Sequence, residues 1–212
     1  MKLNKLAICF IIILGDLASV SSAFATVVDF NDVSVPSTFV AGTSITSGGF
    51  AFTNTAATND VIVVTKDTAS TCSGGCVDDG SQYLSVFNSD QTAPFEVIMS
   101  SVSNAPFSLY SFDLSAWFSF TLGSGNTLDL IGTLEGGGTV TQSVTFEPGL
   151  SHFQIVNVDP TFRDLSSVLF RSNQVFPAFD NIDVPEPGSL AALSVGLVGM
   201  GVMRRRRKRL SA

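Results

Sequence analysis

The sequence predicts an all-β protein built around a single β-sandwich or jelly-roll domain. Between residues 26 and 184, apolar and polar residues alternate in short runs, which is the period-two pattern of half-buried strands. Glycine, proline, asparagine and aspartate separate the runs, and no segment has the spacing of an amphipathic helix. Many short strands joined by turns are typical of sandwiches and jelly rolls.

The clearest predicted strand runs from Thr139 to Phe146. Val140, Val144 and Phe146 would lie on one face, with threonine and serine on the other. The run 127–135 precedes it across three glycines, so the two predict an antiparallel hairpin. The 18 phenylalanines are the expected core fillers, because phenylalanine buries a large area without a polar group. SITSGG is interpreted as a turn. About eleven strands are expected in all. Besides the two strands of the hairpin they are TVVDF, GFAFTN, VIVVT, QYLSVFN, FEVIMS, FSLYSFDLSAWFSF, FQIVNV, SVLFRS and FDNIDV.

The first 25 residues have the three parts of a secretory signal peptide. Lys2 and Lys5 precede an apolar stretch from Leu6 to Leu14, and Ala23-Phe24-Ala25 forms a small-residue cleavage site. This pattern predicts removal of residues 1–25 by cleavage after Ala25. The alternative is an uncleaved membrane anchor, for which the apolar stretch is short.

The charge of the body excludes one class of function. Between residues 26 and 187, three basic residues stand against 17 acidic residues, which gives a formal net charge of −14. Such a surface repels nucleic acid, which needs Lys and Arg to neutralise its phosphates. It suits an exported, soluble domain and could attract divalent cations.

Two cysteines of the body, Cys72 and Cys76, lie close together in TCSGGCVDD. In an oxidising compartment such a pair predicts a disulfide across a short loop. A redox pair or half of a zinc site are the alternatives. Three residues separate the cysteines, not two, and His152 is the only histidine in the chain, which leaves zinc short of ligands.

The composition changes abruptly at Pro185. Residues 188–203 carry no charge, and as a helix they would be about 24 Å long, slightly less than a bilayer core of about 30 Å. The basic residues that follow residue 203 predict a stop-transfer signal, which keeps the C-terminal end in the cytoplasm while the body lies outside. The basic cluster consists of Arg204, Arg205, Arg206, Arg207, Lys208 and Arg209.

The tripeptide Pro185-Glu186-Pro187 precedes this segment. Its two prolines favour an extended backbone and delay helix entry, which is the conformation that a processing enzyme accepts. The tripeptide, the apolar helix and the terminal basic cluster resemble the PEP-CTERM sorting signal of Gram-negative bacteria, also catalogued as an ice-binding protein C-terminal domain. The resemblance implies transient anchoring in the inner membrane, processing by an exosortase, and delivery to the cell surface or the exopolysaccharide matrix. The alternative is a permanent single-span anchor.

The body resembles the jelly-roll domains of many PEP-CTERM proteins, which are similar to galactose-binding-like or carbohydrate-binding modules. The stretches TLDLIGTLEGGGTVTQSVTF, RDLSSVLF and AFDNIDV carry this resemblance. It implies that the first and last strands meet, often around a structural calcium ion. The candidate oxygen ligands in DFND and FDNID are Asp29, Asn31, Asp180 and Asp183. The alternative is that these residues only form the turns at the ends of strands. No cofactor is expected to be required.

A catalytic set is hard to find in this sequence. The G-x-S-x-G motif is absent, no serine is singled out as a partner for His152, and the acids are too numerous to pair. The sequence therefore predicts a non-enzymatic, exported protein that is structural or binds extracellular polysaccharide. Trp117, Tyr83 and Tyr110 are the aromatic candidates for stacking on sugars, although each could be a core residue. The alternative is a surface carbohydrate-active hydrolase with two unidentified acids.

Overall fold

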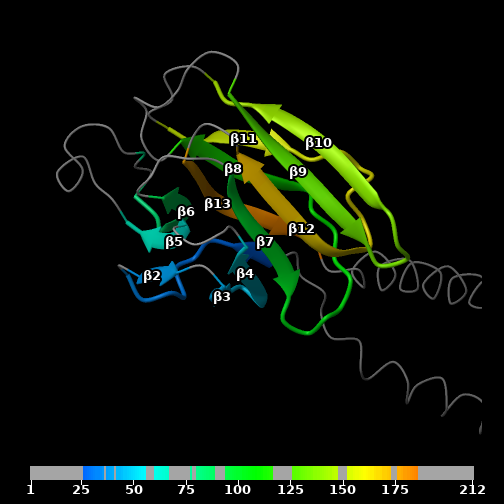
Figure 1. Ribbon diagram of the computed structural model, residues 1–212, viewed down its shortest axis with the longest axis horizontal. Helices are drawn as coiled ribbons and strands as arrows, with labels where there is room; N and C mark the ends of the chain where they lie inside the picture. The colour runs from blue at the N-terminus through cyan, green and yellow to red at the C-terminus, as the bar shows by residue number, and fades with distance from the viewer. Residues whose placement is uncertain are drawn as a thin grey trace, which may run out of the picture. The chain divides into compact units, whose positions relative to one another are not determined.

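The computed structural model describes residues 26–35, 37–40, 42–55, 60–66, 77, 80–88, 94–116, 126–147, 152–172 and 176–185. Every regular element in these ranges is a strand, which confirms the all-β prediction (Figure 1). None of the described ranges holds a helix that could cross a membrane. The strands are β1 (Thr26–Val28), β2 (Ser37–Val40), β3 (Ser44–Ser47), β4 (Phe50–Asn54), β5 (Asp60–Thr65), β6 (Tyr83–Asn88), β7 (Phe95–Ser101), β8 (Ser111–Ala116), β9 (Thr127–Leu134), β10 (Thr139–Thr145), β11 (Gln154–Asn157), β12 (Leu165–Ser172) and β13 (Pro177–Val184).

The strands form two antiparallel sheets. Sheet A has the order β11-β8-β13-β6-β5-β2, and β1 pairs with β13 outside this path. Sheet B has the order β10-β9-β12-β7-β4-β3. Both sheets contribute side chains to one buried cluster, so the domain is a β-sandwich. One compact unit of the chain extends from Ala25 to Pro185.

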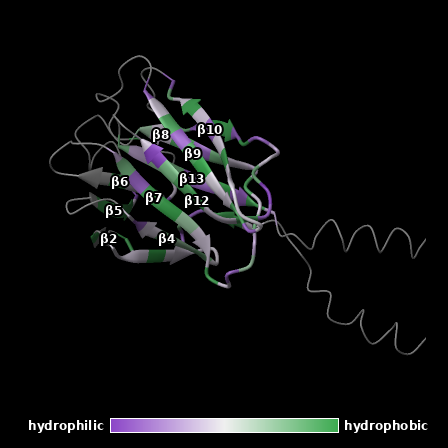
Figure 2. Ribbon diagram, turned by 45° about the vertical axis from the view of Figure 1, so that its right-hand side comes forward, coloured by the Kyte–Doolittle hydropathy of each residue, from purple (hydrophilic) through white to green (hydrophobic). Residues whose placement is uncertain are grey.

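Period-two alternation places every second residue of a strand inside the sandwich, as β7 illustrates. In β7, Phe95, Val97 and Met99 are buried, whereas Glu96 and Ile98 between them are only partly covered. Bands of hydrophobic and hydrophilic residues alternate along the strands in Figure 2. The same alternation in β10 leaves its threonines and serine exposed, as the sequence predicts.

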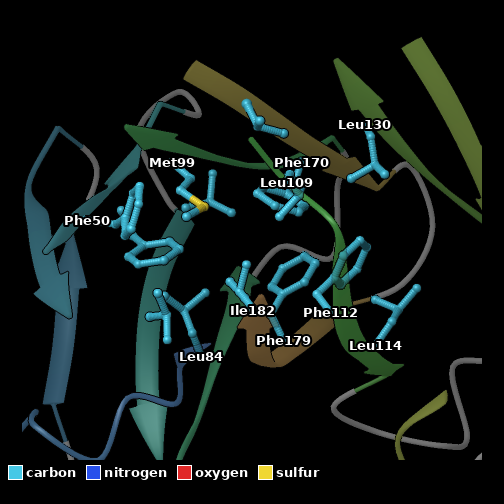
Figure 3. Close-up of a cluster of buried hydrophobic side chains, with 14 of the residues drawn as sticks. Phe50, Leu84, Met99, Leu109, Phe112, Leu114, Leu130, Phe170, Phe179 and Ile182 are labelled. Carbon is cyan, nitrogen blue, oxygen red and sulfur yellow. The ribbon is translucent and has the colours of Figure 1, made fainter. Parts of the chain in front are cut away.

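Phenylalanine rings join the two sheets at the centre of the core. Phe170 of β12 in sheet B packs edge-on against Phe112 of β8, with 5.6 Å between ring centroids, and lies 5.0 Å from Phe179 of β13. Figure 3 shows these rings among aliphatic side chains from both sheets. The prediction that phenylalanine fills the core is confirmed, since the buried cluster also includes Phe30, Phe50, Phe52, Phe95, Phe107, Phe146, Phe162 and Phe176.

The predicted hairpin between residues 127–135 and 139–146 is present as β9 and β10. The seven pairs run from Thr139 opposite Thr133 to Thr145 opposite Thr127. Gly137 and Gly138 both have φ of 90°, a conformation that other residues rarely adopt. Within β9, Gly132 serves a second purpose, because side chains from three directions crowd the position where a Cβ atom would stand.

Replacing Gly132 with alanine is expected to destabilise the domain. The added Cβ would lie 2.8 Å from Cδ2 of Leu165, 2.9 Å from Cγ2 of Val140 and 3.2 Å from Cδ1 of Phe162. Overpacking of this kind costs about 1–3 kcal/mol, measurable by urea unfolding of the purified domain. Gly136→Ala is the matched control, because no atom lies within 4 Å of its Cβ position. Equal stability of the two variants would contradict this packing.

Sequence interpretation was wrong at three places in the fold. SITSGG is not only a turn, because Ser44–Ser47 forms β3 against β4. Ser37–Val40, which was not predicted, forms β2 against β5. The long run 107–120 is not one strand, since β8 covers Ser111–Ala116 and Phe107 instead bridges to Leu165. The predicted signal peptide (residues 1–25) and apolar helix (188–203) lie outside the described residues.

Candidate functional site

Strand β13 leads directly into the sorting tripeptide, and it changes partners near its end. Its first part lies between β8 and β6, where Ala178 and Phe179 pair with β6. A bulge follows between Asp180 and Asp183, and Asn181 there has φ of 47°, which asparagine tolerates better than most residues. Beyond the bulge, β1 replaces β6 as the partner. The bulge therefore gives the chain's last strand a separate terminal segment.

The terminal segment of β13 is held from both sides. On one side Thr26, Val27 and Val28 of β1 pair with Val184, Asp183 and Ile182. On the other side the backbone N–H of Tyr110 donates to the carbonyl of Asp183 at 3.1 Å. Val184 itself is only 2% exposed. The expectation that the first and last strands meet is thus confirmed, and Pro185 follows without a linker.

The loop after β1 anchors that short strand to sheet B. Phe30 is fully buried and packs edge-on against Phe52 of β4 at 5.1 Å. The carboxylate of Asp32 accepts hydrogen bonds from the hydroxyl of Ser47 and from the backbone N–H of Gly48, the latter at 3.0 Å. Three residues of β1 would pair only weakly without such support.

One exposed aromatic residue lies beside the terminal segment. The Tyr110 side chain is 41% exposed, and the guanidinium of Arg163 stands over its ring, 5.9 Å from the centroid. This is within the distance for a cation–π interaction. The body carries only three basic residues, so one of them serves to cover this tyrosine.

Hydrogen bonds fix the loop that presents Arg163. The N–H of Val158 donates to the carbonyl of Tyr110 at 2.8 Å, and the N–H of Asp159 donates to the side-chain oxygen of Gln142 at 2.8 Å. The Asp159 carboxylate accepts from the backbone N–H and the hydroxyl of Thr161. Both bonds lower the pKa of Asp159, and the bond from the backbone N–H has the larger effect. The loop therefore has a defined shape next to Tyr110.

The other two aromatic candidates differ from Tyr110. Tyr83 is 0% exposed and packs edge-on against Phe153 at 5.7 Å, in a small cluster with Val77 and Ala178. It is a packing residue and not a sugar platform. Trp117 lies outside the described residues. Of the three, Tyr110 is the one that the described structure places at the surface.

The four candidate calcium ligands belong to different networks. The amide of Asn31 donates to Asp29 at 2.9 Å, so these two residues satisfy each other in the loop after β1. Asp180 is buried and accepts from the hydroxyl of Ser81 at 2.6 Å. Asp183 pairs with Val27. Within the described ranges no three His, Cys, Asp or Glu residues gather where they could hold a metal ion, and calcium binding stays a prediction.

A pair of carboxylates and the histidine occupy separate places. The Asn181 amide donates to Asp113 at 2.9 Å and to Asp180 at 3.4 Å, so it bridges two acids. His152 is exposed before β11, and its backbone carbonyl, not its imidazole, accepts the hydroxyl of Ser115 at 3.1 Å. A serine nucleophile would need its hydroxyl at the imidazole, which Ser115 does not provide.

Several predicted site residues lie outside the described part of the chain. They comprise Cys72 and Cys76, two residues of the tripeptide (Glu186 and Pro187), and the basic cluster. Conversely, sequence reasoning missed Arg163 as a partner of Tyr110 and missed the bulge at Asn181. The only available signal was indirect, namely the rarity of basic residues and the asparagine within a strand-like run.

The tail matches the description PEP-CTERM protein-sorting motif over residues 183–208. The matched range therefore begins two residues inside β13 and includes the tripeptide and most of the basic cluster. This motif indicates export and sorting to the cell surface in Gram-negative bacteria. No curated protein sequence matches the chain.

Solved structures resemble the domain only distantly. An exo-beta-agarase is 15% identical with a TM-score of 0.44, over 77% of this chain and 25% of its own length. TmCBM61 in complex with beta-1,4-galactotriose is 12% identical with a TM-score of 0.39, over 65% of this chain and 88% of its own. The N-terminal endo-1,4-beta-D-xylanase 10B of Clostridium thermocellum, complexed with xylohexaose, is 12% identical with a TM-score of 0.41, over 78% of this chain and 29% of its own length. At such scores, none of them indicates what this chain binds.

Proposed function

Because this chain carries a PEP-CTERM protein-sorting motif, we propose that it is an exosortase substrate whose β-sandwich is delivered to the cell surface or the exopolysaccharide matrix. The observation that carries the proposal is the junction between the domain and the motif. The matched motif begins within β13, at the end of a folded domain, and runs on into the tripeptide. In this proposal residues 1–25 are removed on export, residues 188–203 pause in the inner membrane, and residues 26–184 are the cargo.

The cargo is proposed to be a non-enzymatic, jelly-roll binding module of the galactose-binding-like type. Its acidic body, with a net charge of −14 between residues 26 and 187, keeps it soluble outside the cell. Its proposed ligand is extracellular polysaccharide. Aromatic side chains that stay accessible to solvent can bind neutral sugar rings. Tyrosine and tryptophan suit this role because each combines an apolar ring with a polar tip.

Tyr110 is the proposed sugar-stacking residue. It is exposed, and its backbone is fixed by hydrogen bonds to Asp183 and Val158. Arg163 stands over one face of its ring and carries hydrogen-bond donors, so the proposed sugar contact is with the other face. A rigid aromatic residue next to a guanidinium loses little conformational entropy on binding. The residue thus offers both apolar contact and polar contacts to one sugar unit.

Tyr110→Ala is expected to reduce retention of the purified domain on the polysaccharide of its own bacterium by about tenfold, the typical value of one lost aromatic contact. Retardation in affinity electrophoresis measures this. Tyr110→Phe should retain most of the binding, because the ring remains. Ile155→Ala is the matched control, since Ile155 is an exposed apolar residue on β11. Wild-type domain that is not retained at all would contradict glycan binding.

A second experiment separates a binding module from a hydrolase. Asp113 and Asp180 lie close enough to share the amide of Asn181, and a carboxylate pair is the minimum equipment of a glycosidase. Size-exclusion chromatography of the polysaccharide after incubation should show no shortening. Shortening that disappears in Asp113→Asn would identify a hydrolase instead.

A further inference from the structure

The sorting motif and the folded domain overlap. The matched motif begins at Asp183, but Asp183 and Val184 are the last two residues of β13. Val184 is buried, and its register partner is Thr26, the first residue of β1. The residues that enter a processing site ahead of Pro185 are therefore the same residues that complete sheet A.

Extended substrates usually bind enzymes through their backbone, which adds a strand to the binding site. In this chain the backbone of the terminal segment already has partners on both sides, namely β1 and the N–H of Tyr110. Three residues from Pro185 to Pro187 span at most about 11 Å. The tripeptide therefore starts directly after a strand whose backbone is already paired.

We propose that the terminal strand pair, defined as β1 with Ile182–Val184 of β13, controls processing of the sorting motif. The exosortase acts on the opened form, in which β1 has left β13 and the backbone edge of the terminal segment that faced β1 is free, while the other edge stays bonded to Tyr110 and Ser111. This inference rests on the proposed function, because it concerns regulation of the same motif. After processing, β1 pairs again and the new C-terminus is held within sheet A.

The terminal strand pair is suited to reversible opening. It contributes three register pairs, whereas the interior pairing of β9 with β12 contributes seven. The bulge at Asn181 separates it from the part of β13 that packs between β8 and β6. Short terminal elements open locally at a lower free energy than the domain unfolds. The body can therefore stay folded while the motif is exposed.

A disulfide across the strand pair tests the proposal in the full-length chain. Thr26 and Val184 are directly opposed, a placement that brings Cα atoms to about 4.5–5.5 Å from each other, which is within the range that a disulfide spans in an oxidising compartment. In an exosortase-containing bacterium, the Thr26→Cys/Val184→Cys double variant should accumulate as the longer form. Reductant should restore processing, and the Thr26→Cys single variant, which lies outside the matched motif, should be processed normally. A verified cross-linked chain that is processed at the wild-type rate would overturn the proposal.

A second variant decides the question without a cross-link. Six Gly and Ser residues inserted between Val184 and Pro185 move the tripeptide away from the domain. The insertion should shorten the half-time of processing in a pulse-chase experiment by at least about tenfold, since burial of one valine alone favours the paired form by that factor and the strand pair buries Val28, Ile182 and Val184. It should also restore processing to the cross-linked chain. An insertion variant that is processed no faster than wild type counts against control by β1.

The outcomes distinguish this inference from the proposed function. If replacement of Pro185, Glu186 and Pro187 leaves the product unchanged, the exosortase assignment fails. If that replacement blocks processing but neither the cross-link nor the insertion alters its rate, sorting stands and control by the strand pair fails.

Discussion

A variant in which Pro185, Glu186 and Pro187 are all replaced by alanine is expected to remain in the membrane fraction as a longer form. Proline favours an extended backbone at the residue before it and opposes helix entry. Three alanines, which favour helix, would remove this preference, so that a helix over residues 188–203 could begin earlier. Without an extended strip the enzyme has no substrate, so the expected loss of processing is nearly complete. Fractionation and mass measurement of the intact protein check this result.

Pro160→Ala is the control for that experiment. Pro160 is an exposed proline in the body, far in sequence from the tail, so its replacement should leave the mature mass and location unaltered. A triple variant that matches wild type in both properties would contradict the sorting function. The chain would then be a permanent single-span protein that carries a β-sandwich.

Phe170→Ala is expected to cause the largest loss of stability. Phe170 is the ring through which sheet B contacts Phe112 and Phe179 of sheet A, and it is almost completely buried. Truncation of such a ring removes its transfer free energy and leaves a cavity, at a cost of about 3–5 kcal/mol. Since domains are stable by only about 5–15 kcal/mol, the variant should lose a large share of its stability.

Urea unfolding of the domain comprising residues 26–184 measures that loss. Ile155→Ala is the matched control, because Ile155 is 74% exposed and surface changes usually lie within about 0.5 kcal/mol. If Phe170→Ala unfolds at nearly the wild-type urea concentration, the two sheets do not depend on this ring for their packing.

Most of the fold could be predicted from periodicity, and the exceptions have physical reasons. The eleven expected runs all contain strands, because alternation and β-branched or aromatic residues suffice to indicate half-buried strands. Ser44–Ser47 shows the same alternation over only four residues and holds one large apolar residue, Ile45, so its pairing with β4 is what identifies it as a strand. Residues 107–110 share the composition of β8, but their backbone bonds go to Phe162, Leu165 and Asp183. Tertiary contacts decide both cases.

Less of the candidate site could be predicted. The tripeptide and its flanking segment are local in sequence, so the motif was recognisable without a structure. The contact between Arg163 and Tyr110 joins residues 53 positions apart, and no pattern within either stretch of sequence predicts it. Tyr83 and Tyr110 also have similar neighbours in sequence, yet one is buried and the other exposed. Only the fold separates a core tyrosine from a surface one.

The opposition of Thr26 and Val184 also determines how the domain would bear mechanical load. A pull on the chain beyond Val184, with the body held by what it binds, acts first on the three pairs with β1 and on the bonds of Asp183 to Tyr110 and Ser111. Those pairs can detach while β8, β6 and the phenylalanine core remain in place. The strand end thus yields before the sandwich does, and force at the tether reaches the rest of the domain only after β1 has peeled away.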